Sequence, residues 1–147
     1  FLPYDKKERK EILMELKKET RTIILYEAPH KLKKTLQDLY DALGNRDISI
    51  CKELTKKHET NFRTTLWDAI QYYEENEPRG EYVLVLEGAD KKKLVEEDLQ
   101  PLLDKTVTEH MEYYMESGMD KKEAMKAVAK DRGVSKRDIY QILLKEE

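Results

Sequence analysis

The 147-residue chain has little of several residue types, and each shortage excludes a class of protein. It contains one cysteine, Cys51, so no internal disulfide can form; this fits a reducing compartment, and we expect a cytoplasmic location. No apolar run approaches the roughly 20 residues of a membrane span, and no signal peptide is visible. We therefore expect no association with a membrane.

Histidine and glycine are scarce as well. The three histidines are not at metal-ligand spacing and no Cys-x-x-Cys occurs, so we expect no metal site. The five glycines are scattered and form no Gly-x-Gly pair. Charged residues, in contrast, make up 40% of the chain, but the net charge is −3. Any affinity for nucleic acid must then come from a local basic patch.

Hydrophobic periodicity predicts alternating strands and helices over residues 1–93. Strands are expected at 22–26, 48–51 and 82–88, with a short edge strand near 59–64. Between them, capping patterns and apolar repeats predict helices that begin near Asp5, Leu32 and Thr65, the second of which Gly44 ends. This order predicts an α/β domain with a sheet of four to five strands flanked by helices.

Polar side chains follow each of the three main predicted strands. These exits are Glu27–His30, Glu53–Lys56 and Glu87–Asp90. In an α/β sheet with right-handed crossovers such exits lie at one edge, where ligands bind. We therefore expect the three exits to share one site. Turn chemistry is the alternative, with Pro29 in a first helical turn and Glu27 or His30 capping it.

Four stretches occur in a particular order: FLPYDKKERK, RTIILYEAPHKL, KELTKKHE and RGEYVLVLEG. Over Phe1 to Gly88 they make the chain similar to the C-terminal half of the small-subunit ribosomal RNA ribose methyltransferase I family, in the tetrapyrrole-methylase superfamily. The resemblance implies two α/β domains with S-adenosylmethionine in the cleft between them, and a homodimer. It also implies methylation of a cytidine ribose 2′-hydroxyl in the RNA of the small (30S) ribosomal subunit.

The chain departs from this family in two ways. Ala28 and Lys31 stand where the family commonly has Ser and Arg, which removes a hydroxyl and replaces a bidentate fork by a point charge. The glycine-rich loops of the family's N-terminal half are absent, and the chain begins with Phe1 instead of Met. We therefore expect a C-terminal fragment that carries half of the cleft and is inactive alone.

The family resemblance implies catalytic, cofactor-binding and RNA-binding roles for residues of the matched motifs. The candidates for substrate positioning or for the catalytic base, whose identity stays open, are Glu27, His30 and Glu53. The residues expected beside the cofactor are Tyr26, Ala28, Leu54, Thr55 and Gly88. The residues of this domain expected at the RNA substrate are Pro29, Lys31 and Lys56. Either glutamate would need a raised pKa to act as a base.

Residues 94–147 are expected to form a small all-α appendage. After a leucine-rich connector that ends near Asp104, three helical patterns follow, and Gly133-Val134 between the last two predicts a helix-turn-helix-like arrangement. Its expected core positions include Ile139, Ile142 and Leu143. The residues expected to contact RNA phosphates are Lys126, Lys130, Arg132, Lys136 and Arg137. A three-helix packing module with a solvated basic face is the alternative.

Two functions of other classes are compatible with the sequence. One is a DNA-binding regulator in which the α/β part senses a ligand and the helix-turn-helix pattern binds DNA. The other is a dimerisation module without a site of its own. The reading frame upstream of Phe1 discriminates between these functions and a methyltransferase, because glycine-rich loops there would favour the enzyme.

Overall fold

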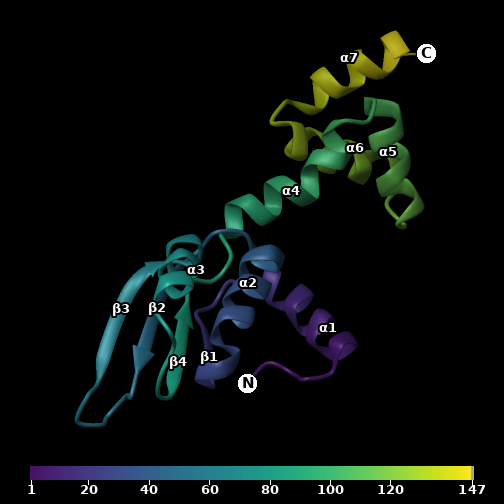
Figure 1. Cartoon of the computed structure of the whole chain (residues 1–147). Coiled ribbons are helices and arrows are strands. Elements are labelled where there is room, and N and C mark those ends of the chain that lie inside the picture. The colour runs from purple at the N-terminus through teal and green to yellow at the C-terminus, as the bar shows by residue number, and fades with distance from the viewer. Residues whose placement is uncertain (147) are drawn as a thin grey trace. The chain divides into compact units, whose positions relative to one another are not determined.

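The computed structural model describes residues 1–146 and divides the chain into two compact units, which we treat separately (Figure 1). The α/β unit is Phe1–Lys91, and the helical unit begins at Lys92. The predicted fold class, an α/β sheet flanked by helices with a small all-α part, is confirmed. In the described residues no helix is both long and apolar enough to cross a membrane.

A four-stranded antiparallel sheet forms the centre of the α/β unit. Its strands are β1 (Ile23–Glu27), β2 (Asp47–Lys52), β3 (Thr60–Thr65) and β4 (Tyr82–Leu86), in the order β1-β4-β2-β3. The register pairs both Glu27 and Lys52 with Tyr82. The strands β1 and β2 therefore run in the same direction, and β4 runs between them in the opposite direction.

The expectation that all three strand exits lie at one edge is wrong. The exits of β1 and β2 do share an edge, but β4 ends at the opposite edge. The reason is strand β3, which runs antiparallel to β2 and returns the chain to the opposite end of the sheet before α3 begins. Strand β4 therefore starts where β1 and β2 end and runs antiparallel to both. Gly88 lies at that opposite edge, pressed against the backbone carbonyl of Thr20, and the Ala89 N–H donates to the Glu19 carbonyl at 2.6 Å.

Helices cover one face of this sheet and leave the other open. The helices of the unit are α1 (Lys6–Lys17), the short 3-10 turn η1 (Pro29–Lys31), α2 (Leu32–Leu43) and α3 (Leu66–Glu75). The fully buried apolar side chains of the unit are Leu32, Leu36, Leu39, Ile50, Leu66, Ala69, Leu84 and Leu86. On the other face, Ile24 and Tyr26 of β1 are 62% and 57% exposed. We call this second face the open face.

Side chains predicted as helix caps take those positions in the structure. The Asp5 carboxylate accepts hydrogen bonds from the backbone N–H groups of Lys7 and Glu8 at the start of α1. At the start of α3, the Thr65 hydroxyl accepts from the Asp68 N–H at 3.2 Å. Each cap satisfies backbone donors that the first turn of a helix leaves unpaired.

The helical unit contains four helices in its described part. They are α4 (Lys91–Leu103), which begins at the last residue of the α/β unit, α5 (Val107–Glu116), α6 (Lys121–Arg132) and α7 (Lys136–Glu146). The segment expected as a connector is therefore helix α4. The core side chains shared by α5, α6 and α7 are Val107, Met111, Ala124, Val128, Ala129 and Ile139.

A helix-turn-helix arrangement joins α6 to α7. Gly133 ends α6 at φ +66°, a left-handed conformation that glycine adopts without strain. Of the three apolar positions predicted for the core of α7, Ile139 is fully buried and Leu143 is half-buried. Ile142 is 36% exposed, so its expected place in the core is wrong. It lies next to, not on, the stripe of α7 that faces the other helices.

Candidate functional site

A hollow of about 670 Å³ opens at the edge where β1 and β2 end. We call it the exit hollow. Its lining residues are Phe1, Tyr26, Glu27, Ala28, Pro29, His30, Leu54, Thr55, Glu81, Tyr82 and Val83. Both predicted motifs contribute, through Tyr26 to His30 and through Leu54 with Thr55. Segments that are more than 20 residues apart in the sequence therefore meet at one concave surface, of a volume typical of small-molecule sites.

Glu27 holds the backbone that leaves β1. Its side chain points to the helix-covered face and is only 6% exposed. One carboxylate oxygen accepts the Ala28 N–H at 2.8 Å, and the other accepts the Thr35 hydroxyl at 2.5 Å. Arg9 of α1 donates in turn to the Thr35 oxygen at 2.9 Å and pairs with Asp38 at 2.9 Å. Glu27 thus anchors the turn before η1 to α1 and α2.

Glu53 holds the backbone that leaves β2. One carboxylate oxygen accepts the Glu81 N–H at 2.7 Å, and the other pairs with the Lys56 ammonium at 3.1 Å. The Glu81 N–H first, and Lys56 second, lower the pKa of Glu53. Gly80 packs directly against this carboxylate, at φ +84°. Glu53 therefore clamps the loop after β2 to the residue before β4, and the direction of its pKa shift is opposite to the raised pKa expected of a general base.

The backbone at the second motif adopts an uncommon conformation. Glu53 has φ +53° and Thr55, which is β-branched, has φ +66°. Few residues with a Cβ occupy this region, and β-branched residues do so rarely. The two conformations turn Leu54 outward, where it is 40% exposed and lines the exit hollow. The strained turn is held in place by the Glu53 clamp and by a Thr55 N–H bond to Glu59 at 3.1 Å.

The remaining site predictions of this unit do not all line the exit hollow. His30 is exposed and lines the hollow. The predicted RNA contacts Lys31 and Lys56 both have partners in the chain. The Lys31 ammonium lies 3.1 Å above the centre of the Tyr4 ring, and Lys56 pairs with Glu81 at 2.7 Å as well as with Glu53. Gly88, at the opposite edge of the sheet, is not part of this hollow.

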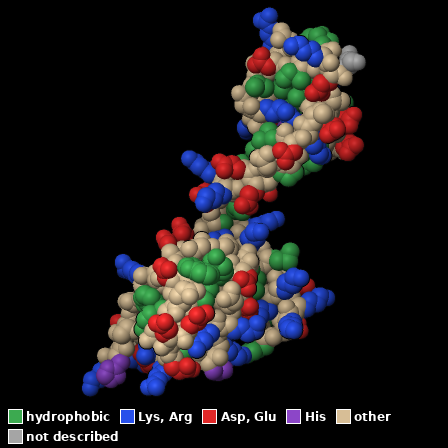
Figure 2. Space-filling view, turned by 45° about the horizontal axis from the view of Figure 1, so that its top comes forward, with side chains coloured by type: hydrophobic (Ala, Val, Ile, Leu, Met, Phe, Trp, Pro, Cys, Tyr) green, Lys and Arg blue, Asp and Glu red, His purple; other side chains and the backbone are tan. Residues whose placement is uncertain are grey.

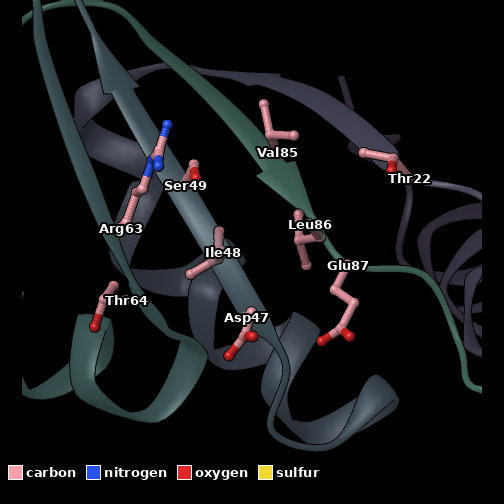
Figure 3. Close-up of a pocket in the computed structure, with 9 residues that line it drawn as sticks. All are labelled: Thr22, Asp47, Ile48, Ser49, Arg63, Thr64, Val85, Leu86 and Glu87. Carbon is pink, nitrogen blue, oxygen red and sulfur yellow. The ribbon is translucent and has the colours of Figure 1, made fainter.

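A second hollow, of about 480 Å³, lies on the open face toward the edge where β4 ends. Figure 3 shows Arg63 beside Ser49 at one end of it and the carboxylates of Asp47 and Glu87 at the other. Glu87, from the third predicted strand exit, lines it, but none of the residues to which a catalytic, cofactor or RNA role was assigned does so. The exit hollow is therefore the place on this unit where the predicted residues gather.

The acidic side chains of α6 and α7 are all engaged within the helical unit. Glu123 forms a reciprocal capping box with Asp120. Asp138 accepts both the N–H and the hydroxyl of Ser135, whose hydroxyl lowers the pKa of Asp138. Glu146 accepts the Thr108 N–H at 2.9 Å and hydroxyl at 2.6 Å, which ties the end of α7 to the start of α5.

Most cations of the same two helices have no such partners. On α6 and α7, the Lys and Arg residues that are exposed and make no ion pair within residues 1–146 are Lys121, Lys122, Lys126, Lys130, Lys136, Arg137 and Lys145. Figure 2 shows such Lys and Arg side chains projecting from this unit. Because α6 and α7 carry eight Lys and Arg residues against four Asp and Glu residues, their surface presents net positive charge.

Arg132 differs from the other predicted RNA contacts because its side chain turns inward. It donates to Nδ1 of His110 at 3.1 Å and to the Lys105 carbonyl at 2.6 Å. His110 is fully buried, and its Nε2 lies 3.1 Å from Asp131, which also accepts the Tyr114 hydroxyl. Burial lowers the pKa of His110. A neutral imidazole that donates from Nε2 and accepts at Nδ1 satisfies both neighbours.

Several lining residues were not assigned to the site from the sequence. Phe1, Glu81, Tyr82 and Val83 lie in stretches that carry the family resemblance, but only the fold shows that they meet the two motifs at the exit hollow. Thr35 did carry a signal, since it places a hydroxyl on the otherwise apolar face of α2. Among residues 1–146, no group of three or more His, Cys, Asp or Glu side chains is placed to hold a metal ion.

Comparison with known proteins identifies relatives along almost the whole chain. Ribosomal RNA small subunit methyltransferase I of Halalkalibacterium halodurans is 46% identical over 146 residues, which are 97% of this chain and 48% of that protein. The Bacillus subtilis protein of the same name is 45% identical over 95% of this chain and 48% of its own length. The Synechocystis protein is 38% identical over 100% of this chain and 51% of its own length.

The chain spans about half the length of these relatives and matches a C-terminal portion of them. No family model matches it. The identity of 38–46% nevertheless extends over nearly all residues of the chain. The matched region therefore includes both motifs, the sheet of the α/β unit and the helical unit. The predicted resemblance is thereby confirmed, and this chain belongs, as about one half of a member, to the ribosomal RNA small subunit methyltransferase I family.

Proposed function

We propose that this chain forms one wall of the cleft of an S-adenosylmethionine-dependent methyltransferase that modifies a cytidine ribose 2′-hydroxyl in small-subunit ribosomal RNA. The proposal depends on one observation above all, the convergence of both motifs at the exit hollow. The names of the relatives support the class of reaction and of substrate. Cytoplasmic location and homodimer formation accompany the proposal, as the family resemblance implies.

The chemistry of the exit hollow fits part of the proposed cofactor. Tyr26, Leu54, Ala28 and Val83 present apolar and aromatic surface, which suits the flat adenine ring. Thr55 adds a hydroxyl at the rim. These residues would hold the adenosine part of S-adenosylmethionine, which supplies an electrophilic methyl group when bound. We omit Gly88, because it lies at the opposite edge of the sheet.

The chain's own contribution to methyl transfer is positional. A direct displacement needs two reactants held in line and a proton removed. The carboxylates of Glu27 and Glu53 accept hydrogen bonds from the loop backbone, so we assign these two glutamates the role of positioning residues. His30 is the one of the three candidates whose side chain stays exposed at the hollow, and it can contact the nucleotide there. We place the base outside this chain or at His30.

The helical unit extends the proposal to RNA. Exposed cations without acidic partners suit a phosphate backbone. We therefore propose that Lys126, Lys130, Lys136 and Arg137 contact phosphates, and we exclude Arg132 because it is bonded to His110 and Lys105.

A hybrid enzyme tests the proposed function. The C-terminal half of the Halalkalibacterium halodurans relative is replaced by this chain, and transfer of labelled methyl groups to unmodified 30S subunits is measured, with nuclease digestion to identify the nucleoside. We expect labelled 2′-O-methylcytidine from the hybrid and none above background from the isolated chain. A folded hybrid without transfer would contradict the proposal.

Two variants of the hybrid separate the exit hollow from the rest of the open face. Tyr26 and Ile24 lie on the same strand, are exposed to similar degrees, and differ in that only Tyr26 lines the hollow. Tyr26→Ala should weaken S-adenosylmethionine binding about tenfold, the equivalent of roughly one lost aromatic contact. Ile24→Ala should leave it unchanged. Equal effects of both variants would place the cofactor elsewhere.

A further inference from the structure

The outer side of α7 combines cations with an aromatic ring. Its exposed residues recur in pairs one helical turn apart, which places them along one stripe of the helix. This α7 stripe consists of Lys136, Arg137, Tyr140, Gln141, Leu144 and Lys145. The buried Ile139 and half-buried Leu143 occupy the other side, against α5 and α6. The stripe is thus the side of α7 that packing leaves unused.

Tyr140 is the unusual member of this stripe. It is 53% exposed, and within residues 1–146 its ring contacts no other aromatic ring and its hydroxyl has no hydrogen-bond partner. Every other tyrosine of the helical unit has such a neighbour. Tyr113 and Tyr114 pack edge to face at 5.2 Å between ring centres, and Tyr114 also stacks on His110. An exposed ring without intramolecular function is a surface available for stacking.

The surroundings of Tyr140 determine which partner suits it. Lys136 and Arg137 precede it by one turn, and Lys145 follows it. The stripe itself contains three cations and no acid, because Asp138 and Glu146 lie outside it, hydrogen-bonded to Ser135 and Thr108. A row of cations favours a polyanion, and a tyrosine face favours a nucleobase, whose π-surface stacks irrespective of base identity.

We propose that Tyr140 stacks on an unpaired base of RNA while Lys136 and Arg137 contact the flanking phosphates. The α7 stripe is thereby a binding surface for single-stranded RNA, such as a loop or bulge, and not for a regular duplex, whose bases are stacked on one another. This inference rests on the proposed role of the helical unit in RNA binding. It adds a base-stacking residue to what would otherwise be contacts with phosphates alone.

Fluorescence anisotropy of a labelled 12-nucleotide unstructured RNA, with the full chain, tests the inference. Tyr140→Ala should weaken binding roughly 5- to 100-fold, the range found for loss of one stacked base. Tyr140→Phe keeps the ring and should stay within about twofold of the unaltered chain. Tyr113→Ala is the matched control, because Tyr113 is 47% exposed on α5, outside the stripe. It should also stay within about twofold.

Salt dependence separates stacking from charge. Neutralising two phosphate contacts in Lys136→Gln/Arg137→Gln should reduce the slope of log affinity against log salt by about 1.4, at about 0.7 per phosphate of a single strand. Tyr140→Ala should leave that slope unchanged. An abasic RNA of the same length should bind the unaltered chain and Tyr140→Ala equally. Thermal unfolding of each variant verifies that it is folded, as expected for an exposed position.

Results other than those expected would contradict base stacking by Tyr140, RNA binding by the helical unit, or both. If Tyr140→Ala binds RNA like the unaltered chain while the double charge variant is weakened, the stacking inference is wrong and phosphate binding stands. If neither is weakened, RNA binding by the helical unit is wrong as well, although the hybrid enzyme can still be active. If Tyr140→Ala abolishes self-association in sedimentation velocity but spares RNA binding, the stripe is a protein interface.

Discussion

The two units of this chain use carboxylates as hydrogen-bond acceptors in different places. In the α/β unit, Glu27 accepts the Ala28 N–H just after β1 and Glu53 accepts the Glu81 N–H just before β4, beside a shaped, largely apolar hollow. In the helical unit, Asp138 and Glu146 of α7 accept at helix starts, and α7, like α6, carries more Lys and Arg than Asp and Glu. The same chemistry fixes the entry and exit of strands in one unit and the ends of helices in the other.

The difference follows from where the acceptors lie. A carboxylate at a strand exit fixes the direction in which a loop leaves the sheet, so nearby apolar side chains such as Leu54 are turned outward. A carboxylate at a helix start accepts hydrogen bonds from N–H groups that would otherwise be solvated. Its negative charge also interacts favourably with the positive end of the helix dipole. Such an interaction changes little in the backbone and leaves the carboxylate ionised, as the lowered pKa values of Asp138 and Glu146 indicate. The positive charge of α6 and α7 therefore follows from their excess of Lys and Arg, which can be counted in the sequence.

The largest predicted change in stability comes from removing a core side chain of the helical unit, which tests whether the two units are independent. Ile139→Ala removes a fully buried side chain and should destabilise the helical unit by about 2–5 kcal/mol. Ile142→Ala, at a position 36% exposed, should cost much less. Urea unfolding followed by circular dichroism reports both units, and fluorescence of Trp67, the sole tryptophan, reports the α/β unit. A shift of the Trp67 transition in Ile139→Ala would show that the units do not unfold independently.

The second prediction sharpens the account of the Glu27 anchor. Thr35→Val removes the hydroxyl between Arg9 and Glu27 and leaves buried polar groups without partners, so it should destabilise the α/β unit by about 1–3 kcal/mol. Thr35→Ser retains the hydroxyl and should recover most of that loss. Trp67 fluorescence in urea measures the stability, and the NMR signals of His30 report whether the turn stays ordered. Equal stabilities of the two variants would mean that the hydroxyl is dispensable.

The smallest expected effect concerns pH and only the helical unit. Burial lowers the pKa of His110 below its ordinary value of 6.5, so the unfolded chain binds a proton in a range where the folded chain does not. Stability of the helical unit is therefore full above about pH 6.5 and decreases as the pH falls below it. The charged groups that face the imidazole are Asp131, Arg132 and Lys105.

Urea unfolding by circular dichroism at pH 7.5 and pH 5.5 measures this decrease. Within that window the engaged carboxylates Asp138 and Glu146, whose pKa values are lowered, stay ionised. His110→Gln, which can hydrogen-bond but does not titrate, should remove the decrease. A decrease of the same size in His110→Gln would assign the pH dependence to another group.

The sequence predicted those features that depend on neighbours in the chain. Asp5 and Thr65 were predicted as helix starts and cap helices in the structure, because a cap acts within one turn. The motif residues Tyr26 to His30 meet Leu54 and Thr55 at one hollow, as expected. Both strands that carry these motifs run in the same direction, so their exits coincide even though the sheet is antiparallel.

Features that depend on distant contacts could not be predicted in this way. The direction of β4 follows from the reversal at β3, and periodicity carries no information about strand direction. Arg132 lies in a basic run like its neighbours, and only the position of His110, 22 residues earlier in the chain, turns its guanidinium inward. The roles of Glu27 and Glu53 likewise depend on Thr35 and Glu81, which no motif connects with them.

The open face of the sheet also provides an experimental handle. Cys51 is the sole cysteine of the chain and is half-buried. The register places it between Val83, which lines the exit hollow, and Asn61 of the edge strand. A thiol-directed fluorophore or spin label attached there needs no engineered cysteine and no removal of competing thiols. Whatever covers the open face or fills the exit hollow would change the mobility and polarity that such a label reports.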